Sequence, residues 1–202
     1  MKNKKALAFL SFLILTVSSY AEDAAQSRFV AGAIISHSTI KSYEEDYTNT
    51  SSELSYYGNG YVSLEAGYEF RLGKYFSLTP YLNLNRNGWS WDYNGHAGHI
   101  SYFNPNLKLA GTVYIMRRFN LSFGGYYGRP FYFWGELDGE STTDDMSYTD
   151  THSYGGFYSV GFAPWEHFRI GIIHSIELLE SESSDYYTQD VQALGLCVTY
   201  MM

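Results

Sequence analysis

Residues 62–72 read V-S-L-E-A-G-Y-E-F-R-L, and their side chains alternate strictly between two kinds. Val62 and Leu64 belong to an apolar set at even positions, whereas Glu65 and Glu69 belong to a polar set at odd positions. A period of two is that of a β-strand whose two faces meet different surroundings. The stretch therefore predicts an extended strand with one apolar face and one polar face.

The same alternation recurs along most of the chain. It predicts eight strands, at residues 28–40, 62–72, 76–87, 106–115, 119–128, 154–163, 168–178 and 191–202. Short turns lie around Lys74, Arg117 and Glu166, and long polar segments cover residues 41–57, 87–103, 136–153 and 179–190. An even number of strands, joined alternately by short and long connections, is typical of bacterial outer-membrane barrels.

The beginning of the chain has the parts of a secretory signal peptide. Three lysines precede an apolar run at residues 6–17, and the small residues Ser19 and Ala21 occupy the −3 and −1 positions of a cleavage site. This run is shorter than the roughly 20 residues that a membrane-spanning helix needs. We therefore expect a signal peptide at residues 1–21 and one exported barrel domain at residues 22–202.

Charge and cysteine content narrow the class of protein further. The formal net charge is −8, and it becomes −11 when the three lysines of the signal peptide are removed. Such an acidic chain is not expected to bind nucleic acid. Cys197 is the single cysteine, which excludes an internal disulfide. We expect no cofactor, and a closed ring of main-chain hydrogen bonds would hold the fold together.

Alternation alone does not say whether the apolar face points outward, so a secreted lipocalin-like barrel is the alternative to a membrane barrel. The polar face favours the membrane barrel, because it carries charges of both signs that can pair across an interior. The predicted lumen charge network consists of Glu65, Glu69, Arg71, Lys108, Arg169 and Glu177. An eight-stranded barrel has room only for its own side chains or one small ligand. No sizeable pore is therefore expected.

With these strands and connections, the chain resembles the small eight-stranded outer-membrane proteins of the OmpA membrane-domain, OmpX and OmpW kinds. The resemblance covers nearly all of residues 28–202 and is one of pattern, without a family-specific motif. It implies an all-β fold, an eight-stranded antiparallel transmembrane β-barrel with up-and-down meander topology. Such proteins usually end in Phe or Trp, and Met202 departs from that pattern.

The same resemblance implies a location and a role. We expect a monomer in the outer membrane of a Gram-negative bacterium, exported through residues 1–21 and in contact with outer-membrane lipid and lipopolysaccharide. A packed polar lumen and acidic extracellular loops indicate a structural or surface-interaction role. An OmpW-like small-solute conduit is an alternative, and it would require a gap in the lumen network.

Acidic side chains gather in the long polar segments. Asp138, Glu140, Asp144 and Asp145 form a candidate cation-binding loop, because Ca²⁺ and Mg²⁺ take oxygen ligands. The simpler interpretation is a solvated surface that keeps the loops extended. No segment has EF-hand spacing, and His96 and His99 are too few for a metal site. Divalent cations at the loops are therefore a hypothesis, and we assign no residue as a metal ligand.

His37 and His174 share the apolar faces of their strands, where a histidine that faces lipid would be costly. Lipid A deacylases of the PagL kind carry a His-x-Ser pair on the barrel exterior, with the serine as nucleophile. Here Ser175 follows His174 directly. Two residues after His37, where the His-x-Ser pair would require a serine, the sequence has Thr39. We therefore expect no catalytic residue and a protein that is not an enzyme, with a lipid A deacylase as the alternative.

Overall fold

The computed structural model describes residues 27–41, 55–57, 59–93, 96–115, 118–138, 140–141, 151–181 and 188–202. The predicted signal peptide at residues 1–21 lies outside these ranges. The strands are β1 (Arg28–Lys41), β2 (Ser55–Tyr57), β3 (Asn59–Arg71), β4 (Phe76–Tyr93), β5 (His96–Tyr114), β6 (Phe119–Gly128), β7 (Phe131–Leu137), β8 (Glu140–Ser141), β9 (Thr151–Trp165), β10 (Phe168–Ser181) and β11 (Thr188–Met201). Within the described part of the chain, no helix has the length and apolar character needed to cross a bilayer.

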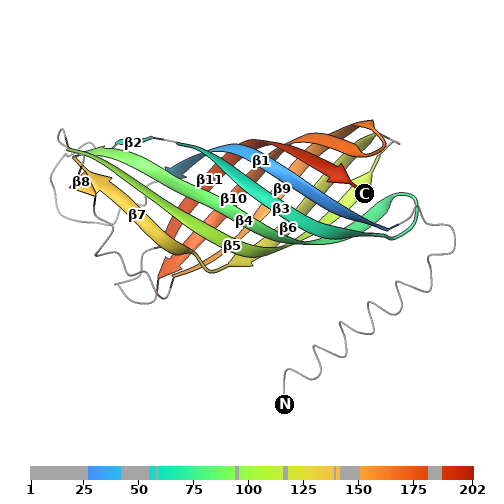
Figure 1. Ribbon diagram of the computed structural model, residues 1–202, viewed down its shortest axis with the longest axis horizontal. Helices are drawn as coiled ribbons and strands as arrows, with labels where there is room; N and C mark the ends of the chain where they lie inside the picture. Colours follow the sequence, from blue (N-terminus) through green and yellow to red (C-terminus); the bar gives the residue numbers. More distant parts are fainter. Residues whose placement is uncertain are drawn as a thin grey trace, which may run out of the picture.

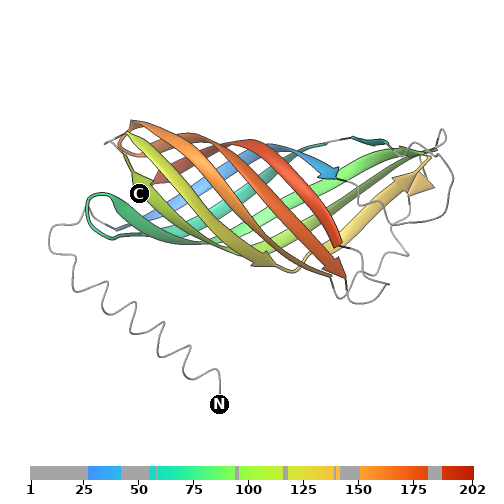
Figure 2. The ribbon, with the colours of Figure 1, turned by 180° about the vertical axis from the view of Figure 1, so that it is seen from behind.

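Eight strands form a closed antiparallel barrel in meander order (Figures 1 and 2). The ring runs β1, β3, β4, β5, β6, β9, β10, β11 and returns to β1. Closure occurs where β1 pairs with β11, with Val30 opposite Met201 and Ile35 opposite Leu196. The predicted all-β, eight-stranded meander barrel is confirmed.

The barrel has two different ends. At the turn-side end, β3 connects to β4 through residues 72–75 and β9 connects to β10 through Glu166 and His167. The described chain also begins and ends there, because residue 28 starts β1 and residue 201 ends β11. The opposite end, which we call the loop-side end, carries the long connections.

The predicted loop at residues 87–103 is wrong. This segment instead lengthens β4 and β5 into a long hairpin, paired continuously from Phe76 opposite Val113 to Tyr93 opposite His96. Its composition is rich in aromatic residues, which favour strands whether or not their faces alternate in polarity. β2 pairs with the outer part of β4, and β7 and β8 continue the sheet beside the outer part of β5. We call this extension beyond the barrel wall the loop-side sheet (Figure 1).

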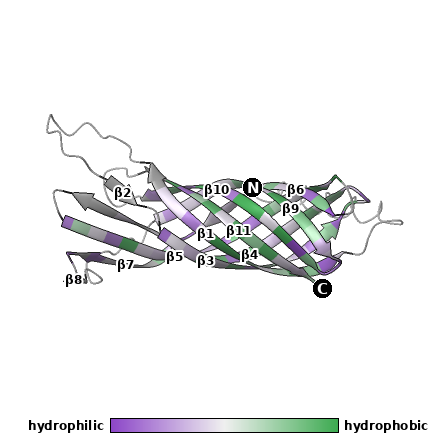
Figure 3. Ribbon diagram, turned by 90° about the horizontal axis from the view of Figure 1, so that it is seen from above, coloured by the Kyte–Doolittle hydropathy of each residue, from purple (hydrophilic) through white to green (hydrophobic). Residues whose placement is uncertain are grey.

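The apolar face of each barrel strand points outward. Leu64 and Leu196 are each 58% exposed, whereas Glu65 and Glu69 are 7% and 1% exposed. Colouring by hydropathy shows green and purple residues in alternation along the barrel strands (Figure 3). This is the reverse of the polarity of a water-soluble barrel.

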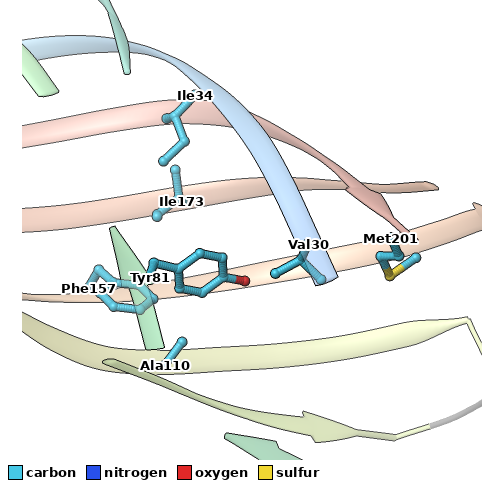
Figure 4. Packing of buried hydrophobic residues seen from close by; sticks show 7 residues of the cluster. All are labelled: Val30, Ile34, Tyr81, Ala110, Phe157, Ile173 and Met201. Atoms are coloured by element: carbon cyan, nitrogen blue, oxygen red, sulfur yellow. The ribbon is translucent and has the colours of Figure 1, made fainter. Parts of the chain in front are cut away.

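The interior is not uniformly polar. Seven buried residues form an apolar cluster between the strands: Val30, Ile34, Tyr81, Ala110, Phe157, Ile173 and Met201 (Figure 4). They come from six strands around the ring, so the cluster ties opposite walls of the barrel together. The sequence pattern did not indicate this cluster, because it lies on the face that is otherwise polar.

Two glycines on neighbouring strands give a test of how closely the wall is packed. A Cβ on Gly124 would lie 1.9 Å from the carbonyl oxygen of Leu109, whereas a Cβ on Gly156 would have no heavy atom closer than 3.6 Å. We expect Gly124→Ala to lower the free energy of unfolding by about 1–3 kcal/mol, because the backbone has to move. Gly156→Ala should change it by less than about 0.5 kcal/mol. Denaturant unfolding of the refolded barrel measures both, and equal effects would contradict this packing.

Candidate functional site

The structure places all six residues of the predicted lumen network on the inner face of the barrel, in three layers along its axis. Five of them are less than 9% exposed, and Arg71 is half-buried near the turn-side end. The layers are described below from the turn-side end to the loop-side end.

The turn-side layer is centred on the carboxylate of Glu69. Arg71 Nε lies 2.9 Å from Glu69 Oε1, and Arg28 Nε and Arg169 Nη2 lie 3.3 and 3.4 Å from Glu69 Oε2. The hydroxyl of Tyr114 also donates to Glu69. Three guanidinium groups from three strands therefore share one carboxylate, and they close the turn-side mouth of the barrel.

Sequence reasoning missed two members of this layer. Arg28 shares the inward parity of Val30, and Tyr114 shares the parity of Lys108 on β5. Parity was therefore a signal for both, but each lies at the end of its strand, where an interior position is hard to tell from a position at the rim. The hydroxyl of Tyr114 also accepts a hydrogen bond of 2.8 Å from Arg169 Nη2. The guanidinium carbon of Arg71 lies over the ring of Tyr114, 3.7 Å from the ring centroid.

The middle layer is a single ion pair. Lys108 Nζ lies 2.8 Å from Glu65 Oε2, and Asn83 donates to the same oxygen at 3.5 Å. The ammonium of Lys108 also lies 4.2 Å from the ring centroid of Phe157, which belongs to the apolar cluster. This layer therefore combines one neutralised charge pair with aromatic packing.

The loop-side layer surrounds Glu177 with neutral donors. The side-chain amides of Asn87 and Asn104 each donate to the carboxylate at 2.5 Å, and Asn104 also donates to Ser153 at 2.6 Å. The partners of Glu177 are thus neutral amide and hydroxyl groups, where the sequence suggested a paired charge. Between this layer and Lys108 lies a cavity of about 40 Å³ with both polar and apolar lining residues, space for a few water molecules.

Above this cavity, β3 separates from β4. Paired positions extend to Leu64 opposite Leu84 and resume at Tyr57 opposite Ser90. In between, Gly88 approaches the side chain of Tyr61, and its carbonyl oxygen accepts a 3.1 Å hydrogen bond from buried Ser38 of β1. The long hairpin therefore packs against side chains of β1 and β3 at the loop-side mouth.

The candidate cation-binding loop is only partly described. Asp138 and Glu140 are exposed at the edge of the loop-side sheet, while Asp144 and Asp145 lie outside the described residues. Asp138 Oδ2 lies 2.5 Å from His96 Nδ1, and Asp138 Oδ1 accepts the backbone N–H of Ala97. Over the ranges that the structure covers, no three His, Cys, Asp or Glu side chains gather as metal ligands.

His99, the other histidine of this sheet, contacts neutral groups. Its Nδ1 lies 3.2 Å from the hydroxyl of Ser90 and 3.2 Å from the amide of Asn59, and its Nε2 lies 2.8 Å from Ser101. His96 and His99 therefore point into different hydrogen-bonded groups, and both help to fix the hairpin in the loop-side sheet.

The two histidines of the deacylase alternative are placed on the outer face. The ring of His174 packs on Tyr158 with a centroid distance of 5.2 Å, and its Nδ1 has no hydrogen-bond partner among the described residues. Ser175 points the other way and lines the inner cavity. His37 is exposed on β1, while Ser38 is fully buried inside. Each histidine and the serine that follows it thus lie on opposite faces of the wall.

Comparison with known proteins extends only to the fold. No protein-family model matches the sequence, and no curated protein sequence matches it. Among solved structures, Neisserial surface protein A (NspA) is similar with a TM-score of 0.57 and 9% identity, over 88% of this chain and all of that one. Outer membrane protein AlkL is similar with a TM-score of 0.50 and 11% identity, over 88% of this chain and 90% of that one. These likenesses confirm the small eight-stranded barrel fold that the pattern suggested.

The Glu69 layer predicts a large effect of one amide substitution. Glu69→Gln should lower the free energy of unfolding by about 3–5 kcal/mol, because buried Arg169 and the partly buried Arg28 and Arg71 lose their shared counter-charge. Glu166→Gln, at an exposed position in the β9–β10 turn, is the matched control and should change it by less than about 0.5 kcal/mol. Denaturant unfolding measures both variants. Similar values for the two would show that the shared carboxylate does not hold this end together.

The contact between His96 and Asp138 predicts a pH dependence at the loop-side sheet. The hydrogen bond from His96 holds the pKa of the Asp138 carboxyl below its ordinary value of 3.8. Because the pKa is lowered by folding, the contact stabilises the sheet above pH 3.8 and is lost as the pH falls through the lowered pKa. In His96→Gln, the pKa of Asp138 should rise toward 3.8. Carboxyl-carbon NMR titration measures this, and an unchanged pKa would refute the assigned cause.

Proposed function

We propose that this protein is an integral protein of the bacterial outer membrane, in which a closed barrel carries the loop-side sheet at the cell surface for a structural or binding role. The observation that carries the proposal is the outward direction of the large apolar side chains. Those more than half exposed include Leu64, Leu82, Leu107, Val160, Ile172, Leu194 and Leu196. Contact with lipid removes this surface from water, which is strongly favourable per unit of apolar area.

Aromatic residues at the turn-side rim support the same placement. Tyr75, Phe119, Trp165, Phe168 and Tyr200 are all exposed there, on neighbouring strands and turns. Amphipathic aromatic rings favour the level of the lipid head groups and form girdles at both edges of membrane barrels. The likeness in fold to outer-membrane barrels and the predicted signal peptide at residues 1–21 add support for this location.

The filled interior of the barrel favours a structural scaffold over a channel for small solutes. The Glu69 layer, the Lys108 pair and the Glu177 layer succeed one another along the axis, with a cavity of only about 40 Å³ between the last two. A solute that passed through would have to break buried ion pairs, each costly to separate. This observation favours the packed barrel over the small-solute conduit.

The loop-side sheet is the part of the protein where we expect a partner to bind. It carries Glu136, Asp138 and Glu140 as exposed acids, so a divalent cation that bridges it to an anionic surface remains part of the proposal. Its outermost strands are short, three residues in β2 and two in β8, which limits pairing with other chains through open edges. Recognition through side chains on the faces of the sheet fits this geometry best.

The proposed role predicts that attachment and barrel integrity can be separated. Bacteria that express a variant with residues 139–150 replaced by a short Gly-Ser linker should lose Ca²⁺-dependent attachment to a surface coated with an anionic polysaccharide. The variant barrel should still migrate differently on gels when unboiled, because its wall is intact. Lys74→Ala, at the turn-side end, is the control and should keep attachment. If cells that express the wild-type protein attached no better than vector-only cells, a binding role would be contradicted.

A further inference from the structure

The outer face of the barrel carries an apolar groove across β3, β4, β5 and β6. Its volume is about 570 Å³. The outward side chains that line it are Leu64, Ala66, Leu82, Leu84, Leu107 and Tyr127. Ala66 lies opposite Leu82 and leaves a depression between the larger leucines, because its side chain is a single methyl group. The groove therefore fits an extended hydrocarbon chain that lies along the wall.

Two arginines stand at the loop-side end of this groove. Arg129 lines it directly and reaches across to β5, where its backbone N–H bonds to the carbonyl oxygen of Pro105. Arg86 follows Leu84 by two residues on the same outward face of β4. Both side chains are exposed. Strand spacing and rise place their Cα atoms roughly 12 Å apart, within joint reach of two long arginine side chains.

Aromatic contacts mark this level of the barrel as an interface. Phe103 stacks on Phe131 with a centroid distance of 6.2 Å. Tyr127 stacks on His152, and its hydroxyl lies 2.7 Å from His152 Nδ1. Such a belt lies at the depth of lipid head groups. The arginines therefore lie at the depth of lipid phosphates, and the groove runs from them into the hydrocarbon layer.

We propose that this groove is a binding site for a phosphorylated, acylated glycolipid of the lipid A type. One acyl chain would lie over Ala66, and the phosphates would bind Arg86 and Arg129 by charge-assisted hydrogen bonds. Two cations about two strands apart suit a head group with more than one phosphate. The inference rests on the proposed outer-membrane location.

Lipid binding to the full chain in phosphatidylcholine nanodiscs tests the site. Diphosphoryl lipid A is titrated and its binding followed by native mass spectrometry, with phosphatidylglycerol and dephosphorylated lipid A as comparison lipids. The double variant Arg86→Gln/Arg129→Gln should lose at least about tenfold in affinity for diphosphoryl lipid A, the equivalent of one or more charge-assisted hydrogen bonds. Arg118→Gln, an exposed arginine at the turn-side end, is the matched control and should bind normally.

A second variant tests the groove without touching the arginines. Ala66→Phe fills the depression, so it should weaken binding of diphosphoryl lipid A while the gel mobility of the unboiled barrel is unchanged. Full affinity in both the double arginine variant and Ala66→Phe would overturn the site. Equal affinity for phosphatidylglycerol would overturn the assignment to lipid A. Failure of the full chain to enter nanodiscs would contradict the proposed membrane location itself, and the site with it.

Discussion

The main-chain hydrogen bonds of the barrel wall close on themselves, and the remaining features depend on this constraint. β1 pairs with β3 along one edge and with β11 along the other, so the wall has no free edge. Away from the loop-side mouth, where β3 separates from β4, a wall paired in this way can present apolar side chains outward, even to a medium that offers no hydrogen bonds. Charged side chains at the alternate positions of the same strands, such as Glu65 and Lys108, are thereby directed into the interior.

Because the strands alternate, the interior has to accommodate charges without bulk water. The barrel does so in layers of different chemistry: three arginines around Glu69, one lysine against Glu65, and amide donors around Glu177. The apolar cluster fills space between these layers and contacts the middle one through Phe157. Because the wall is closed and the interior is filled, partners can bind only at the two rims and on the outer face.

Period two was sufficient to predict the strands of the barrel wall, and β6 begins and ends at the predicted residues. It failed at residues 87–103, because beyond the wall the long hairpin is covered on both faces: Ser101 and Tyr102, which point to opposite sides, are both fully buried. Parity also placed the lumen charges inside. It could not reveal that Glu177 is bound by asparagines, or that His96 meets Asp138, because those contacts depend on the register between distant strands.

Lipid exposure of one outward side chain tests the central claim most directly. A nitroxide label at residue 196, in a Leu196→Cys variant that also carries Cys197→Ser, would sit on the outer face of β11, and its collisions with oxygen and with a water-soluble nickel chelate can be measured in lipid vesicles. The account predicts frequent collisions with oxygen, which dissolves in lipid, and few with the chelate. Frequent collisions with the chelate would contradict an outward apolar face in contact with the membrane.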